Sequence, residues 1–171
     1  MIRNSTLAGV IKKHKSLQKF HLNGVLETTD ALLIKMSQYF RGAITLKRFS
    51  LDMQCCEKIT QAGVYPLGKT LKRLSSLQSL DLNFTCCSSL SDASMKTLSR
   101  SFKLQIFLRD LKLSFAFCSQ ITNLGVRHLC QGFKNLICLQ SIKLHFDECN
   151  LITDEGLTFL GKTMRLAGTL F

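Results

Sequence analysis

The sequence predicts an α/β solenoid, a curved horseshoe segment with a parallel sheet on its concave face and helices on its convex face. One observation is a phrase written four times at a spacing of 31 residues: CEKITQAGVYPLGK from Cys56, CSSLSDASMKTLSR from Cys87, CSQITNLGVRHLCQG from Cys118 and CNLITDEGLTFLGK from Cys149. The other is an apolar run that precedes each phrase. A fixed period of this length is typical of stacked repeats, which bury their apolar faces only against one another.

The apolar runs predict the strands. They begin at Leu17, Leu46, Leu77, Leu108 and Leu139. With each leucine as position one, positions four, six and eight are apolar in the last three units, which is the alternation of a strand with one buried face. We expect a single domain, 1–171, with five repeats at 17–45, 46–76, 77–107, 108–138 and 139–169, the tail of a partial repeat at 1–16 and the start of a sixth at 170–171.

The second half of each unit predicts a helix. Position fifteen is a hydroxyl residue in each of the last four units, suited to an N-cap: Thr60, Ser91, Thr122 and Thr153. Apolar residues follow at positions nineteen, twenty-two and twenty-six, as in an amphipathic helix. Position eighteen is small, which predicts a close approach to the strand layer: Gly63, Ser94, Gly125 and Gly156. Strands stack about 4.7–4.9 Å apart and helices about 8–10 Å apart, so we expect the stack to curve with its strands inside.

The pattern LxxLxLxF followed by CxxITDxGLxxL resembles the leucine-rich repeat family, in particular the cysteine-containing subclass found in F-box substrate receptors and their relatives. The resemblance covers nearly the whole chain. The cysteine, however, lies two residues later than in the usual LxxLxLxxC, so either the loop is longer or Phe84, Phe115 and Phe146 take the place of the last leucine. The first unit also differs, since it is two residues shorter and carries GVLETTD instead of a cysteine phrase.

The resemblance implies that four repeated cysteines form a structural ladder of buried, reduced thiols at the strand-to-helix turn: Cys56, Cys87, Cys118 and Cys149. A zinc site is disfavoured because no C-x₂₋₄-C spacing occurs. We therefore expect no metal and no cofactor.

Catalysis is not predicted, and no residue is assigned a catalytic role. His21 and His145 occupy inner-face strand positions four units apart, about 19 Å at strand spacing, which is too far to share one substrate atom. We find no nucleophile with a positioned base and no glycine-rich phosphate loop, so a small-molecule substrate is not expected.

The charge distribution is the most informative feature. The formal net charge is +12, from 23 Lys and Arg against 11 Asp and Glu. Position twenty-seven is basic in every unit and gives a candidate convex interaction column: Lys12, Arg41, Lys72, Lys103, Lys134 and Arg165. The column could act jointly on an acidic partner, because its expected spacing is close to the Debye length. Alternatively, each cation stabilises the last turn of a helix by about 0.3–1 kcal/mol.

The candidate concave interaction face consists of the outward strand residues Lys19, His21, Arg48, Asp52, Asp81, Asp110, Lys112, Lys143 and His145. This face is polar, nearly neutral and without aromatic anchors. Residues that dominate binding energy at interfaces are usually Trp, Tyr or Arg, so the composition of this face does not indicate a particular ligand.

The preferred interpretation is a non-enzymatic protein–protein interaction scaffold, as a subunit or fragment within a larger assembly. One alternative, from the resemblance, is the substrate-recognition arm of an SCF-type ubiquitin ligase, which needs an F-box segment that this sequence does not show. Another is a structural protein of the cilium or cytoskeleton. We expect protein partners, acidic ones included; nucleic acid is disfavoured because the basic helices carry few aromatic residues for stacking.

The chain has no signal peptide and no membrane span by composition, which favours an intracellular, cytoplasmic protein. Neither terminal unit has a polar cap. Leu7, Val10 and Ile11 have no strand of their own, and the last unit ends at Leu170 and Phe171. We therefore expect a fragment of a longer solenoid or a C-terminal end covered by another protein.

Overall fold

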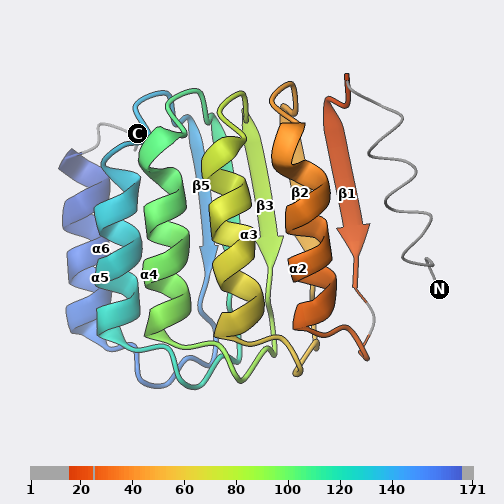
Figure 1. Ribbon diagram of the computed structural model, residues 1–171. Helices are drawn as coiled ribbons and strands as arrows, with labels where there is room; N and C mark the ends of the chain where they lie inside the picture. The colour runs from red at the N-terminus through yellow and green to blue at the C-terminus, as the bar shows by residue number, and fades with distance from the viewer. Residues whose placement is uncertain (1–15, 25, 167–171) are drawn as a thin grey trace.

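The structure is a computed structural model that describes residues 16–24 and 26–166, and it consists of strand–helix units wound in one direction (Figure 1). The strands are β1 (Lys19–Asn23), β2 (Arg48–Asp52), β3 (Ser79–Asn83), β4 (Asp110–Ser114) and β5 (Ser141–His145). The helices are α2 (Asp30–Tyr39), α3 (Gln61–Arg73), α4 (Asp92–Ser101), α5 (Asn123–Phe133) and α6 (Asp154–Leu166), with short 3-10 helices η1 (Phe40–Gly42) and η2 (Phe102–Leu104).

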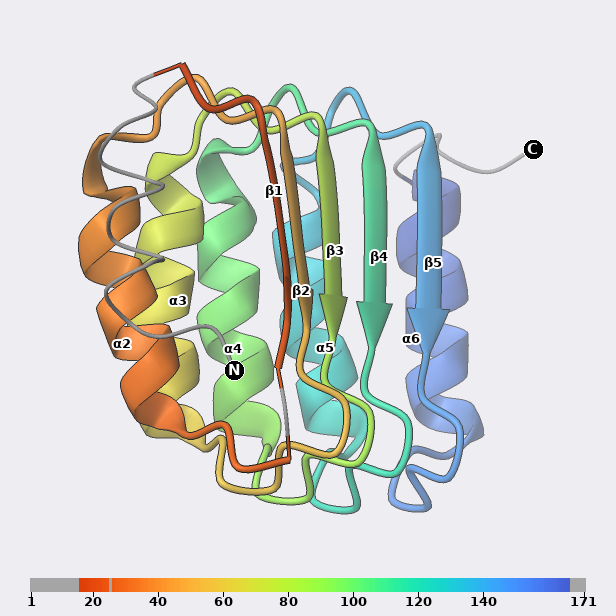
Figure 2. The ribbon, with the colours of Figure 1, turned by 90° about the vertical axis from the view of Figure 1, so that its right-hand side faces the viewer.

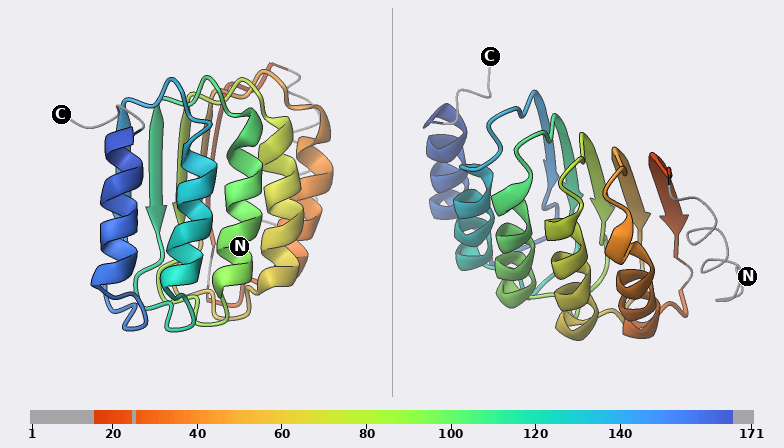
Figure 3. Two further views of the ribbon diagram at one scale, coloured as in Figure 1. Left: turned by 90° about the vertical axis from the view of Figure 1, so that its left-hand side faces the viewer. Right: turned by 45° about the horizontal axis from the view of Figure 1, so that its top comes forward.

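The strands form one parallel sheet in the order β1-β2-β3-β4-β5. Equal repeat positions lie opposite one another, so that Arg48 faces Ser79 and Ser79 faces Asp110. Figure 2 shows the strands as one layer with the helices behind them, and Figure 3 shows the stack curving. The predicted leucine-rich repeat solenoid is confirmed. The expectation of uncovered ends concerns residues outside the described part of the chain: Leu7, Val10, Ile11, Leu170 and Phe171.

Phenylalanines fill the core where each strand ends. Phe84 and Phe115 are fully buried, and the rings of Phe84, Phe115 and Phe146 stack with centroids 5.9 Å apart in each step. They therefore occupy the place of the last leucine in the usual repeat. The loop is also longer, and its residue at position ten has a positive φ in four units: Cys55, Cys86, Phe117 and Glu148.

The starts of α3 and α5 are each bound by a side chain of the preceding helix. The carboxylate of Asp30 accepts hydrogen bonds from the backbone N–H of Thr60 (2.8 Å) and from its hydroxyl (2.7 Å). Asp92 accepts the same two bonds from Thr122, both at 2.8 Å. The predicted N-caps at Thr60 and Thr122 are confirmed, since each hydroxyl also accepts from the backbone N–H two residues later. Asp92 is at position sixteen of its repeat, and Asp30 holds the equivalent place, position fourteen, in the shorter first unit. We call this contact between repeats the N-cap clasp.

Small residues at position eighteen make room for the clasp. A Cβ added at Gly63 would collide with the side chain of Asp30, and one at Gly125 would collide with that of Asp92. The small residue is thus required by the preceding helix, whereas the sequence led us to expect the strand layer. In the third unit Ser94 occupies this position, and its hydroxyl donates to Gln61 at 2.8 Å.

The cysteine ladder is a column of buried thiols: Cys56, Cys87, Cys118 and Cys149. Each of the last three reaches a backbone carbonyl of the preceding unit. The thiol of Cys87 donates to Met53 at 3.1 Å, and that of Cys149 donates to Phe115 at 3.1 Å. Burial raises the pKa of Cys87 and of Cys118 to about 12, because a thiolate would lose its hydration there.

The clasp predicts a difference between two aspartates at the same repeat position. Asp92→Ala should lower the free energy of unfolding by about 1–3 kcal/mol, because the N–H and hydroxyl of Thr122 lose their acceptor. Asp154→Ala is the matched control, since no hydrogen bond to Asp154 occurs among the described residues and only its helix-dipole contribution, below about 1 kcal/mol, is lost. Urea unfolding measures both. Equal losses would show that the clasp adds nothing to the dipole.

The raised pKa values predict thiol reactivity. A thiolate is the nucleophile, so at pH 8 iodoacetamide should label the exposed Cys138 in the native protein and leave Cys87 and Cys118 unlabelled. Their folded-state pKa lies above the usual 9.0, so the stability that these neutral thiols contribute is complete below pH 9 and falls as the pH rises towards 12. Mass spectrometry reads the labelling. Native labelling of Cys87 or Cys118 as fast as that of Cys138 would contradict this account.

Candidate functional site

Cations line the C-terminal ends of the convex helices. Lys72 lies in the last turn of α3, Lys103 in η2, Lys134 at the C-cap of α5 and Arg165 in the last turn of α6, and all four are exposed. None of the four has an ion pair among the residues that the structure describes. The remaining members of the predicted column cannot be placed, because Lys12 and the side chain of Arg41 lie outside the described part of the chain.

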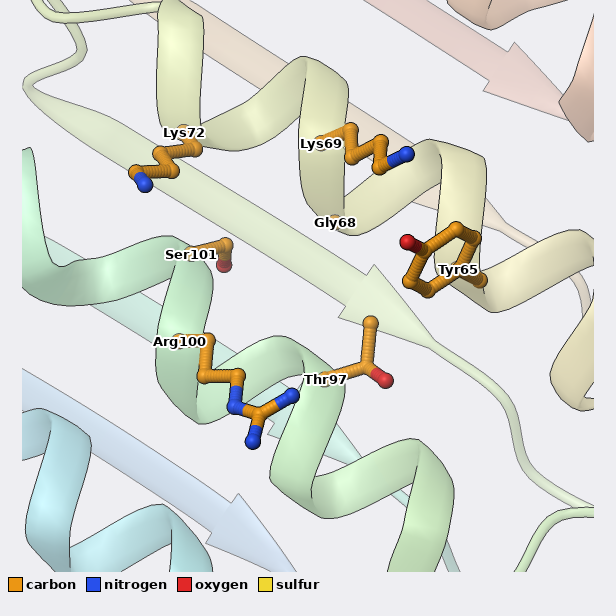
Figure 4. A pocket seen from close by; sticks show the side chains of 7 residues that line it. All are labelled: Tyr65, Gly68, Lys69, Lys72, Thr97, Arg100 and Ser101. Carbon is orange, nitrogen blue, oxygen red and sulfur yellow. The ribbon is translucent and has the colours of Figure 1, made fainter.

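A hollow between α3 and α4 gathers further cations (Figure 4). It has a volume of about 200 Å³ and is lined by Tyr65, Gly68, Lys69, Lys72, Thr97, Arg100 and Ser101. Gly68 allows the close helix contact, since a Cβ there would come within 2.7 Å of the Thr97 methyl group. The Lys69 ammonium lies 4.4 Å from the centroid of the Tyr65 ring. The lining contains no carboxylate, so its positive charge is uncompensated.

A second hollow, of about 300 Å³, is lined by Arg127 of α5 and by Asp154, Glu155, Thr158, Phe159 and Lys162 of α6. Here the guanidinium of Arg127 pairs with Glu155 at 2.7 Å and lies 5.4 Å from the centroid of the Phe159 ring. The hollow between α3 and α4 is therefore the better site for an acidic group.

The nine residues of the candidate concave face all lie on the strands, in the layer opposite the helices (Figure 2). Four of these nine residues contact close neighbours. Lys112 lies 3.8 Å from the carboxylate of Asp81, the ring of His21 is hydrogen-bonded to Ser50 at 2.9 Å, and Asp52 accepts from a loop N–H at 3.1 Å. This face keeps less charge free for a partner than the convex face does.

The described residues contain no group of three or more His, Cys, Asp or Glu side chains that could hold a metal ion. His21 and His145 lie on β1 and β5, at opposite ends of the sheet, as predicted. Within 16–24 and 26–166, no helix is long and apolar enough to span a bilayer.

Sequence reasoning missed the hollow between α3 and α4. Its signal was Gly68, a glycine inside an amphipathic helix, which often marks a close backbone approach. The repeat pattern alone does not show which neighbour approaches, because position twenty-three is occupied by a different residue in each of the next two units, Ser99 and Cys130.

No protein-family model and no curated protein matches the sequence. Among solved structures, the tropomodulin C-terminal domain of Caenorhabditis elegans superimposes with a TM-score of 0.67 at 12% identity, covering 96% of this chain and 93% of that chain. The leiomodin-1 actin-binding site 2 superimposes with a TM-score of 0.64 at 13% identity, covering 97% and 91%. At this identity the likeness shows a shared fold.

The expected membership of the cysteine-containing, F-box type of leucine-rich repeat is wrong. The two similar structures reported above are tropomodulin and leiomodin domains, and no family model matches. The physical reason lies in the cysteine phrase itself. Its thiols donate to backbone carbonyls of the preceding repeat, as the thiol of Cys118 does to the carbonyl of Phe84 at 3.3 Å. The repeated cysteine sequence therefore reflects how the turn packs and carries no information about the partner that the protein binds.

Proposed function

We propose that this protein is a non-enzymatic, protein-binding module of the cytoskeleton that binds an acidic protein surface through its convex helices. The observation that carries the proposal is the uncompensated positive charge at Lys72, Lys103, Lys134 and Arg165, on successive repeats. The fold supports the cytoskeletal part, since both similar structures are tropomodulin and leiomodin domains. One of them is described as an actin-binding site, so filamentous actin is the partner to test first.

The geometry of the convex face suits an extended acidic partner. Packed helices lie about 8–10 Å apart, close to the Debye length at physiological salt, so neighbouring cations act together on one surface. The hollow between α3 and α4 adds a concave place where a partner carboxylate can meet Lys69, Lys72 and Arg100. Charge-assisted hydrogen bonds of this kind are stronger than neutral ones.

The proposed repeats at 46–76, 77–107, 108–138 and 139–169 supply this surface. The concave face is the alternative binding surface. Binding through the convex cations should be sensitive to salt. Binding through the strand residues should be less so, because their four cations are interspersed with three carboxylates. The ubiquitin-ligase and ciliary alternatives receive no support from the comparisons.

Charge reversal on the convex face should abolish the interaction. The triple variant Lys72→Glu, Lys103→Glu and Lys134→Glu should weaken co-sedimentation with actin filaments at low salt by about tenfold or more, because three attractive charges become repulsive. The matched control is Arg48→Glu, Lys112→Glu and Lys143→Glu, which changes the net charge equally on the concave face and should bind like the unchanged protein. Circular dichroism checks that both variants fold.

The outcomes separate the surface from the partner. A folded convex variant that binds filaments unchanged would show that the column only compensates the helix dipoles. Loss of binding in the concave variant alone would assign the interaction to the strands. If the unchanged protein does not co-sediment at any salt concentration, actin is the wrong partner.

A further inference from the structure

Four tight turns join helix ends to strand starts along the upper edge in Figure 1, the edge that comes forward on the right of Figure 3. In each turn the leucine that opens the next repeat donates its N–H to the carbonyl three residues earlier, at 3.1–3.2 Å. The two residues at each tip are Ile44 and Thr45, Ser75 and Ser76, Ile106 and Phe107, and Ile137 and Cys138.

The apolar residues at these tips have no structural explanation. Turns favour Gly, Pro, Asn, Asp and Ser, whose backbone preferences or short polar side chains suit the turn. Instead, the side chains of Ile44, Phe107 and Ile137 are 63%, 56% and 76% exposed, so they contribute little to the core. The second turn has Ser75 and Ser76 in the same place, so the fold accepts polar residues there.

The same edge is cationic. Lys47, Lys103, Arg109 and Lys134 are exposed in or beside the turns. Segments 43–47, 74–78, 105–109 and 134–140 contain no acid, although the exposed Asp110 follows Arg109 directly at the start of β4. Most carboxylates lie at the opposite edge, where strands end and helices begin. The turn edge therefore combines exposed apolar tips with cations, whereas the exposed apolar residues of the opposite edge lie among most of the carboxylates.

We infer that this turn edge binds the surface of an anionic lipid bilayer. Apolar side chains at an interface enter the boundary between headgroups and acyl chains, to a depth of about 5–10 Å, while Lys and Arg beside them meet anionic headgroups. A row of exposed tips suits a broad, flat partner, whereas a partner helix requires a groove. The two hollows described above are lined by helix residues and by no turn residue. The inference does not depend on actin binding.

The test measures co-sedimentation of the whole chain with vesicles. The protein should bind vesicles of phosphatidylcholine mixed with phosphatidylserine and should bind vesicles of phosphatidylcholine alone far more weakly. Ile106→Ser, Phe107→Ser and Ile137→Ser, combined, should lower the partition coefficient by about tenfold or more, because their apolar area no longer enters the bilayer. These substitutions leave Lys72, Lys103 and Lys134 in place, so filament binding reports separately on the convex column.

The matched control changes one aromatic and two aliphatic residues of similar exposure at the opposite edge: Phe117→Ser, Leu124→Ser and Leu151→Ser. Its partition coefficient should equal that of the unchanged protein. The inference is overturned if the protein binds neither vesicle, if it binds both equally, or if the tip and control variants behave alike. It is also overturned if the tip variant keeps vesicle binding and loses filament binding, since the tips would then be a protein-docking surface.

Discussion

The stack depends on the N-cap clasp between successive helices. The start of a helix leaves backbone N–H groups without partners, and most proteins satisfy them within the same segment. Here the N–H of the N-cap threonine itself is bound by a side chain of the preceding repeat, as with Asp30 and Thr60. A helix with a clasp has its N-cap N–H satisfied only when the preceding repeat is in place. The clasp therefore fixes the position of the helix along the axis of the preceding helix.

The clasp tolerates different chemistry at one position. Asn123 accepts from the N–H of Thr153 at 2.9 Å in place of an aspartate. Gln61 instead accepts from Ser94 and donates to Thr97 at 2.9 Å, which ties the first residue of α3 to two residues of α4. The constraint is therefore geometric, and it keeps equal repeat positions in line. When successive repeats carry the same type of residue at one position, these residues therefore line up across the stack. The buried phenylalanines and the exposed cations at the helix ends are two such rows.

Features within one repeat could be predicted from the sequence, because the 31-residue spacing and the alternation of apolar and polar residues indicate them directly. The strands lie at positions three to seven, and α3 and α5 begin directly after Thr60 and Thr122, as expected. Features between repeats were missed, including the clasp, the hollow beside Gly68 and the apolar tips, since they depend on which side chains adjacent units bring together. The basic residues of the convex column were predicted from their repeat position. Only the structure shows that they form no ion pair among the described residues.

Helix-dipole compensation explains part of the positive surface and not all of it. The dipole acts within the first and last turns, so it accounts for Lys72 in α3 and Arg100 in α4. It does not account for the exposed Lys69 and Lys96, which precede those last turns. Nor does it require Arg109, which lies beyond the helices, just before β4. A structural need copied with each repeat would give one row of cations. The observed cations spread more widely than one row, as the proposed binding of an anionic surface requires.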